Sequence, residues 1–163
     1  MGDCVHDKLI KHTKGLQPSL QSEVDIGYLV VPIHGENHWS LAVIRFNGSH
    51  DSCVVHHMDS VHESHDTKQI GTFLNAWIEY GLQVDMTTKI ESTRITQQTN
   101  GYDCGVHVLY VITKLMEVDK EEKLLEYLEN GGLPNSWGTT EIVSDFRLKI
   151  HELFTILLES DTH

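Results

Sequence analysis

The sequence predicts an α+β fold, and three observations support this class. Short runs of β-branched and apolar residues dominate the first half of the chain, which is typical of strands. Longer stretches with apolar residues at helical spacing dominate the second half. The 163 residues, 39% of them hydrophobic, suit one core without a linker or repeat, so residues 1–163 are expected to form a single domain.

The elements are expected in the order strands, helix, strand, helices. The expected strands cover residues 27–33, 39–46, 53–59 and 89–95. The expected helices cover residues 67–80, 104–116, 120–129 and 141–159. Asp66 is a suitable N-cap for the first helix, and Gly81 ends it. The apolar stretch 104–116 is compatible with a strand by composition, but its length favours a helix.

Charge and composition exclude several classes of partner. Lys and Arg number 12 against 24 Asp and Glu, and no basic cluster is present, so a nucleic-acid partner is not expected. No apolar run approaches the roughly 18 residues of a membrane span, so no membrane association is expected. Three widely spaced cysteines argue against a disulfide framework. We therefore expect an intracellular monomer, located in the nucleus, the cytoplasm or both.

The histidine-rich stretches do not match metal sites. A helical zinc motif needs Glu directly after the first His, whereas Glu36 stands two residues after His34 in "HGENH". His62 and His65 form an H-x-x-H pair, but no further ligand stands at a matching distance. These two histidines are expected in an exposed loop. No metal or other cofactor is therefore expected.

Cys104 is a candidate nucleophile. It begins an expected helix after a turn that contains Gly101, and unpaired backbone N–H groups at a helix N-terminus favour a thiolate. A single cysteine is more often a buried structural residue, so this position alone is weak evidence. Three further residues strengthen it: His38 at the start of one strand, Asp59 at the end of the next, and Gln98 six residues before the cysteine.

These residues lie in three motifs, "HWSLAVI" at 38–44, "MDS" at 58–60 and "QQTNGYDCGVHVL" at 97–109. The histidine and aspartate are 21 residues apart (59 − 38), and the aspartate and cysteine 45 (104 − 59). The set resembles the ubiquitin-like protease, or sentrin (SUMO)-specific protease, family of cysteine peptidases over about residues 25–158. The resemblance implies a papain-like fold with a small central mixed β-sheet flanked by helices and the catalytic cysteine at a helix N-terminus.

The resemblance also implies a role for each residue of the set. Cys104 matches the nucleophile and His38 its base. Asp59 matches the residue that orients the imidazole. Gln98 matches a donor to the oxyanion, with Gln97 as the alternative. Backbone N–H groups and such side-chain amides are the donors that a tetrahedral oxyanion needs.

Two further residues have alternative interpretations. Strict strand alternation turns Trp39 inward if its neighbours His38 and Ser40 share the cleft side. The resemblance instead places this indole over the channel that admits the substrate's Gly-Gly tail, which requires the strand to begin only after Trp39. His107 lies three residues after Cys104 on the same helix face, and a packing or polar-contact role is expected for it rather than that of the catalytic base.

The function that the resemblance implies is cleavage after the C-terminal Gly-Gly of a ubiquitin-like modifier. SUMO-type and Rub/NEDD-type modifiers both fit the motifs, with SUMO-type favoured. The enzyme would process modifier precursors or remove modifiers from their targets. Family domains carry an additional N-terminal segment that helps build the substrate-facing surface, and the sequence predicts a shortened version of it. The alternatives are a modifier-binding protein without turnover and an acyltransferase that uses the same triad.

Overall fold

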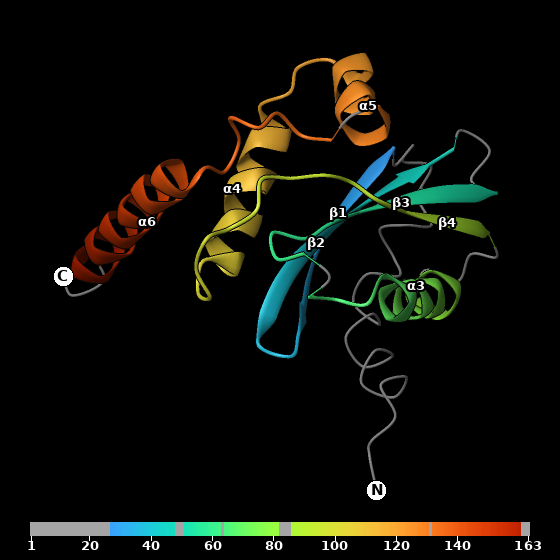
Figure 1. Cartoon of the computed structure of the whole chain (residues 1–163), viewed down its shortest axis with the longest axis horizontal. Helices are drawn as coiled ribbons and strands as arrows, with labels where there is room; N and C mark the ends of the chain where they lie inside the picture. Colours follow the sequence, from blue (N-terminus) through green and yellow to red (C-terminus); the bar gives the residue numbers. More distant parts are fainter. Residues whose placement is uncertain (1–26, 48–50, 63, 82–85, 131, 161–163) are drawn as a thin grey trace, which may run out of the picture. The chain divides into compact units, whose positions relative to one another are not determined.

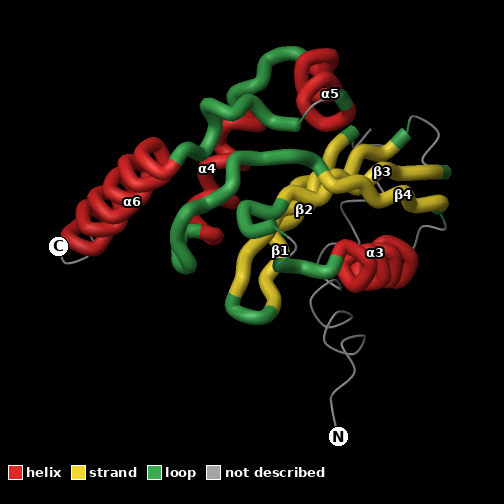
Figure 2. Tube along the Cα trace, in the orientation of Figure 1, coloured by secondary structure: helices red, strands yellow, loops and turns green. Residues whose placement is uncertain are grey.

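The computed structural model describes residues 27–47, 51–62, 64–81, 86–130 and 132–160 (Figure 1). The strands are β1 (Tyr28–Gly35), β2 (His38–Phe46), β3 (Ser52–Met58) and β4 (Thr87–Ser92). The helices are α3 (Thr67–Ala76), the π-helix η1 (Trp77–Gly81), α4 (Cys104–Met116), α5 (Glu121–Glu129) and α6 (Thr140–Ser160) (Figure 2). The predictions for the N-terminal segment, and Cys4 with it, lie outside the described residues. Among the described helices, none combines the length and the apolar character that crossing a membrane requires.

The four strands form one mixed sheet in the order β1-β2-β3-β4. A two-residue turn joins β1 to β2, with φ of 50° at Glu36 and 62° at Asn37, as in a type I′ hairpin. β3 and β4 are parallel, with Ser52 opposite Thr87, and their connection contains α3 and η1. The mixed sheet with its helices confirms the predicted α+β class.

The described residues group into two compact units. The first unit comprises 27–31, Ala42–His57 and His65–Ser92. The second comprises Pro32–Leu41, Met58–Ser64 and the chain from Thr93 onward. All the residues predicted for catalysis fall in the second unit. The single-domain organisation stays a prediction.

In the first unit, α3 packs on β4. Gly71 of α3 lies so close to β4 that a Cβ atom there would collide with the end of the Ile90 side chain. The predicted cap is confirmed, because the Asp66 carboxylate accepts the Lys68 N–H at 2.8 Å. The predicted helix 67–80 is present, but its last turn is a π-helix that ends at Gly81.

In the second unit, α4 covers the residues where β2 begins and β3 ends. Val108 and Val111 of α4 line a narrow gap together with Leu41 of β2, Met58 of β3 and Ser60 just after β3. On another side of α4, its residue Tyr110 contacts Phe146 of α6 edge to face, with ring centroids 5.3 Å apart. α4 has the predicted bounds, and α5 and α6 each agree within one residue at either end.

The last strand differs from the prediction. β4 begins at residue 87 rather than 89 and ends at Ser92 rather than 95. Beyond it, the Arg94 carbonyl accepts the Leu133 N–H at 2.9 Å, and the Thr93 hydroxyl donates to the Leu128 carbonyl at 3.3 Å. The first bond uses a backbone carbonyl that a strand would need, and the second ties the Thr93 side chain to α5, so the segment leaves the sheet although its alternating pattern continues.

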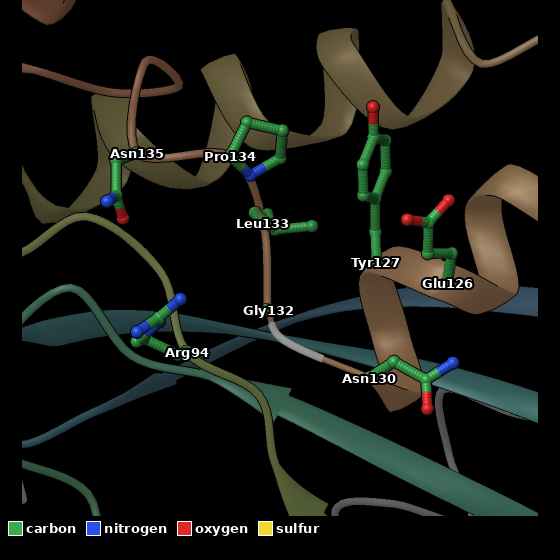
Figure 3. Close-up of a pocket in the computed structure, with 8 residues that line it drawn as sticks. All are labelled: Arg94, Glu126, Tyr127, Asn130, Gly132, Leu133, Pro134 and Asn135. Atoms are coloured by element: carbon green, nitrogen blue, oxygen red, sulfur yellow. The ribbon is translucent and has the colours of Figure 1, made fainter.

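A pocket of about 290 Å³ lies beside this segment in the second unit (Figure 3). Gly132 lines it with φ of 82°, and a Cβ atom there would collide with the Arg94 carbonyl, so the position requires glycine. The lining residues are Arg94, Glu126, Tyr127, Asn130, Gly132, Leu133, Pro134 and Asn135. None of the residues predicted for catalysis is among them.

Candidate active site

His38 and Asp59 form a hydrogen-bonded pair. His38 is the first residue of β2, and Asp59 directly follows the last residue of β3. His38 Nε2 lies 2.6 Å from Asp59 Oδ1, and the two side chains are only 8% and 11% exposed. This bond fixes the orientation of the imidazole and leaves its Nδ1 on the opposite side of the ring. The arrangement is that of a base held in position by a carboxylate.

The hairpin turn determines where His38 stands. Both turn residues have positive φ, and for Glu36 this conformation is strained because the residue is not a glycine, asparagine or aspartate. Such strain persists where the surrounding structure enforces it, often beside functional sites. Here the turn delivers His38 to the first position of β2, where its side chain is buried.

Asp59 is held by the backbone around it as well as by the imidazole. Its Oδ1 also accepts the Val61 N–H at 2.9 Å, and its carbonyl accepts the Gln97 side-chain amide at 2.9 Å. The imidazole and the Val61 N–H therefore hold the carboxylate, and Gln97 holds the Asp59 backbone. Gln97 uses its second amide hydrogen on the Ile95 carbonyl at 3.2 Å, so both of its donors are occupied by backbone.

Gln98 is positioned by residues next to Asp59. Its backbone N–H donates to the Ser60 carbonyl at 2.8 Å, and its Oε1 accepts the Ser60 hydroxyl at 2.8 Å. Its Nε2 donates to the Asn100 carbonyl at 2.6 Å, which uses one of the two amide hydrogens. Gln98 thus keeps one N–H more than Gln97 does for an acceptor outside the chain. Ser60, buried and directly after Asp59, was not singled out by the sequence.

Cys104 is the first residue of α4, as the sequence predicts. It is a free cysteine and is 7% exposed. The helix begins there without a side-chain cap, since Asp103 makes no capping hydrogen bond to the backbone. The first N–H groups of α4 thus have no side-chain acceptor from the N-cap, and they favour negative charge on the thiol. The hydrogen bonds among the described residues join His38 to Asp59 but do not include the Cys104 thiol.

Trp39 links the strand of the histidine to the helix of the cysteine. Its indole lies over Gly105, where a Cβ atom would stand 3.5 Å from the indole Cδ1. Its other neighbour is the His34 ring, 4.5 Å away between centroids. The neighbours in sequence of His38 and Cys104 are therefore in contact, although the two side chains themselves are not hydrogen-bonded.

The expectation that the strand begins only after Trp39 is wrong, because β2 starts at His38. Alternation does operate, with His38 and Ser40 buried, but the indole turns outward and is 40% exposed. Gly105 and the His34 ring cover the opposite face of the strand only in part at this point, so alternation leaves the indole partly at the surface. The core interpretation of Trp39 is wrong as well.

His107 lies one turn after Cys104 and is buried. Burial lowers the pKa of His107, and the negative charge of Asp103 only partly opposes this shift. Gly138 passes beside the ring, where a Cβ atom would stand 3.2 Å from Nδ1. The ring is thus neutral and enclosed at neutral pH, which agrees with a packing role.

A cysteine at a helix N-terminus, together with an imidazole–carboxylate pair on a strand whose next residue contacts that helix, is the arrangement expected of a cysteine peptidase site. A family model described as "Ulp1 protease family, C-terminal catalytic domain" matches residues 4–137. This match covers more than half of the chain. The chain therefore belongs to the Ulp1 protease family, which confirms the resemblance seen in the motifs.

Two curated relatives from Arabidopsis thaliana support the assignment. Ubiquitin-like-specific protease 1D is 24% identical over 155 aligned residues, covering 79% of this chain and 26% of the relative. Ubiquitin-like-specific protease 1C is 24% identical over 150 residues, covering 80% and 26%. The chain thus spans about a quarter of the length of these relatives.

Two solved structures share the fold. A de-sumoylating protease has a TM-score of 0.54 at 23% identity, covering 88% of this chain and 60% of its own. The Xanthomonas campestris effector XopD, solved bound to ubiquitin, has a TM-score of 0.51 at 21% identity, covering 87% and 74%. These similarities establish the Ulp1-type fold for this chain.

Proposed function

We propose that this chain is a cysteine isopeptidase that cleaves after the C-terminal Gly-Gly of a ubiquitin-like modifier, with SUMO-type modifiers as the substrate class. The observation that carries the proposal is the His38–Asp59 pair beside a helix that begins with Cys104. The family membership and the names of the relatives, which act on or bind ubiquitin-like modifiers, support the substrate class. A location inside the cell, where such modifiers occur, is part of the proposal.

The chemistry follows from the orientation of His38. Its Nδ1 takes the Cys104 proton, and the thiolate attacks the carbonyl carbon of the terminal glycine. The tetrahedral intermediate collapses as the C–N bond breaks, and the imidazolium gives its proton to the leaving amine. Water then attacks the thioester, with His38 accepting the water proton, and the C–S bond breaks to release the modifier as a free carboxylate and the Cys104 sulfur as the leaving group. Asp59 orients the imidazole and stabilises the imidazolium throughout.

The direct test measures amide hydrolysis. Fluorogenic C-terminal amides of SUMO-type, Rub/NEDD-type and ubiquitin tails are incubated with the full chain. The proposal predicts release from SUMO-type tails that depends on Cys104. Release from another tail alone would contradict the substrate class, and no release from any tail by folded protein would contradict the enzymatic function.

Gln98→Ala is expected to lower kcat by about 10²–10³ with little change in KM, because a lost oxyanion donor acts only in the transition state. Gln97→Ala is the matched comparison. A smaller effect is expected for it, since both of its amide hydrogens are bound to backbone carbonyls. Steady-state kinetics of both variants on one fluorogenic tail show which glutamine is the oxyanion donor. A larger loss for Gln97→Ala would reverse the assignment of the donor.

Trp39→Ala is expected to reduce cleavage strongly while changing the melting temperature little, because the indole is 40% exposed and rests on Gly105. A flat ring at this position would exclude tails that carry a Cβ atom, so the variant should also discriminate less between Gly-Gly and Gly-Ala tails. Phe154→Ala, which removes an exposed aromatic ring from α6, is the control. A large loss of stability in Trp39→Ala with unchanged tail preference would contradict the channel role.

A further inference from the structure

A buried carboxylate stands immediately before the candidate nucleophile. Asp103 precedes Cys104 in the chain and is only 3% exposed. A negative charge beside a thiol disfavours the thiolate and so raises the pKa of the thiol. An enzyme that needs a thiolate at Cys104 therefore has to neutralise Asp103 or orient it away, and the structure contains a group that can do both.

That group is Arg147 of α6. Its Nη2 donates to Asp103 Oδ1 and also to the Tyr102 carbonyl, the latter at 3.2 Å. Its guanidinium carbon lies 5.3 Å from the centroid of the Tyr102 ring. One side chain from near the end of the sequence thus binds two consecutive residues of the loop that leads into α4.

Asn100 completes the same cluster from within the loop. Its Nδ2 donates to Asp103 Oδ2 at 2.6 Å, so the two carboxylate oxygens have different partners. Its Oδ1 accepts the backbone N–H groups of Tyr102 at 3.1 Å and of Asp103 at 3.0 Å. Its own carbonyl holds the Gln98 side chain. The cluster therefore connects α6 to both the start of α4 and the candidate oxyanion donor.

The ionisation of Asp103 agrees with this arrangement. Burial alone would raise the pKa of Asp103, but the hydrogen bonds from Arg147 and Asn100 and the Arg147 charge together hold it below its usual range. The carboxylate is consequently charged at neutral pH, and Arg147 is the cation that offsets it. His107, on the same helix, is neutral at this pH because burial lowers its pKa.

We propose that Arg147 is a positioning residue for the nucleophile: it fixes the loop before α4 and cancels the charge of Asp103, so that the thiolate of Cys104 forms near neutral pH. Besides Arg147, the ionisable groups relevant to this charge balance are His107, which interacts electrostatically with Asp103, and His38 and Asp59, which the proposed mechanism couples to the thiol. The importance of Arg147 for turnover rests on the proposed function. Its effect on the Cys104 thiol does not.

The test follows the rate of alkylation of Cys104 by iodoacetamide against pH, read by mass spectrometry of the peptide that contains it. Arg147→Gln is expected to raise the midpoint of this profile by about one pH unit, the order of a lost neighbouring charge. Arg147→Lys keeps the charge and is expected to stay near the wild-type midpoint. Asp103→Asn removes the carboxylate and is expected to lower the midpoint, and adding it to Arg147→Gln should reverse the upward shift.

The matched control is Lys149→Gln, which changes the net charge equally on the exposed part of the same helix. Equal midpoints for Arg147→Gln and Lys149→Gln would overturn the proposal, because a merely structural arginine alters stability but not the profile. If Arg147→Gln does not fold, Asp103→Asn tests the proposal instead. An unchanged alkylation midpoint in Asp103→Asn would also overturn the proposal. Failure to cleave any modifier tail, with the midpoint shifted as expected, would refute the proposed function and leave the role of Arg147 intact.

Discussion

Cys104→Ala is expected to abolish hydrolysis of modifier tails, with kcat falling by about 10⁶, the order found when a triad loses its nucleophile. Alanine cannot form the thioester, so only background hydrolysis remains. Because alanine is the best helix former, α4 should begin normally in the variant, and modifier binding should persist. Steady-state assays measure turnover, and calorimetric titration measures modifier binding separately.

Cys53→Ala is the matched control for this experiment. Cys53 lies in β3, and burial raises the pKa of its thiol, while the hydrogen bond with Thr88 at 3.5 Å only partly opposes the shift. A buried, protonated thiol is a poor nucleophile, so this variant should retain turnover. Loss of activity in Cys53→Ala with full activity in Cys104→Ala would show that the nucleophile has been misidentified.

Asp59→Asn is expected to produce the second largest loss, about 10²–10⁴ in kcat, with KM nearly unchanged. The amide keeps the size of the side chain and can still accept the Val61 N–H, so the loop should hold its shape. It cannot stabilise an imidazolium as a carboxylate does, and its NH₂ group favours the wrong tautomer of His38. Steady-state kinetics on one fluorogenic tail measure the change in kcat and in KM separately.

Asp66→Asn provides the matched substitution away from the site. Asp66 caps α3, and asparagine is an equally good N-cap, so activity and melting temperature should both be unaffected. If Asp59→Asn behaves in the same way as Asp66→Asn, the carboxylate has no role in orienting His38. That outcome would leave His38 as a buried strand residue without catalytic function.

Local patterns in the sequence predicted most of the fold, because the elements concerned have strong local signals. The apolar stretch from Cys104 to Met116 gave a helix with the observed bounds, and Asp66 gave the correct cap. The end of β4 could not be predicted, since it depends on the hydrogen bond that the Leu133 N–H, far along the chain, donates to the Arg94 carbonyl. Alternation alone carries no information about such a competing partner.

The candidate site likewise has features that local patterns predict and features that depend on distant parts of the chain. The placement of His38 and Asp59 at strand ends follows from motifs that each occupy a few residues. The outward orientation of Trp39 required knowledge of which face of β2 is covered, which no local pattern contains. Arg147 was missed because it lies 43 residues after Cys104 (147 − 104) on an amphipathic helix, where an arginine is ordinarily a solvated surface residue.

The most direct measurement of the central claim is covalent labelling with a SUMO-type modifier whose Gly-Gly tail ends in a propargyl amide. Such a probe reacts only with a thiolate that is placed to attack the tail, so it requires both recognition and a competent nucleophile. The account predicts one adduct, located at Cys104 by peptide mass spectrometry, absent in Cys104→Ala and retained in Cys53→Ala. Binding of the modifier by folded protein without any adduct at Cys104 would contradict it and identify a modifier-binding protein without turnover.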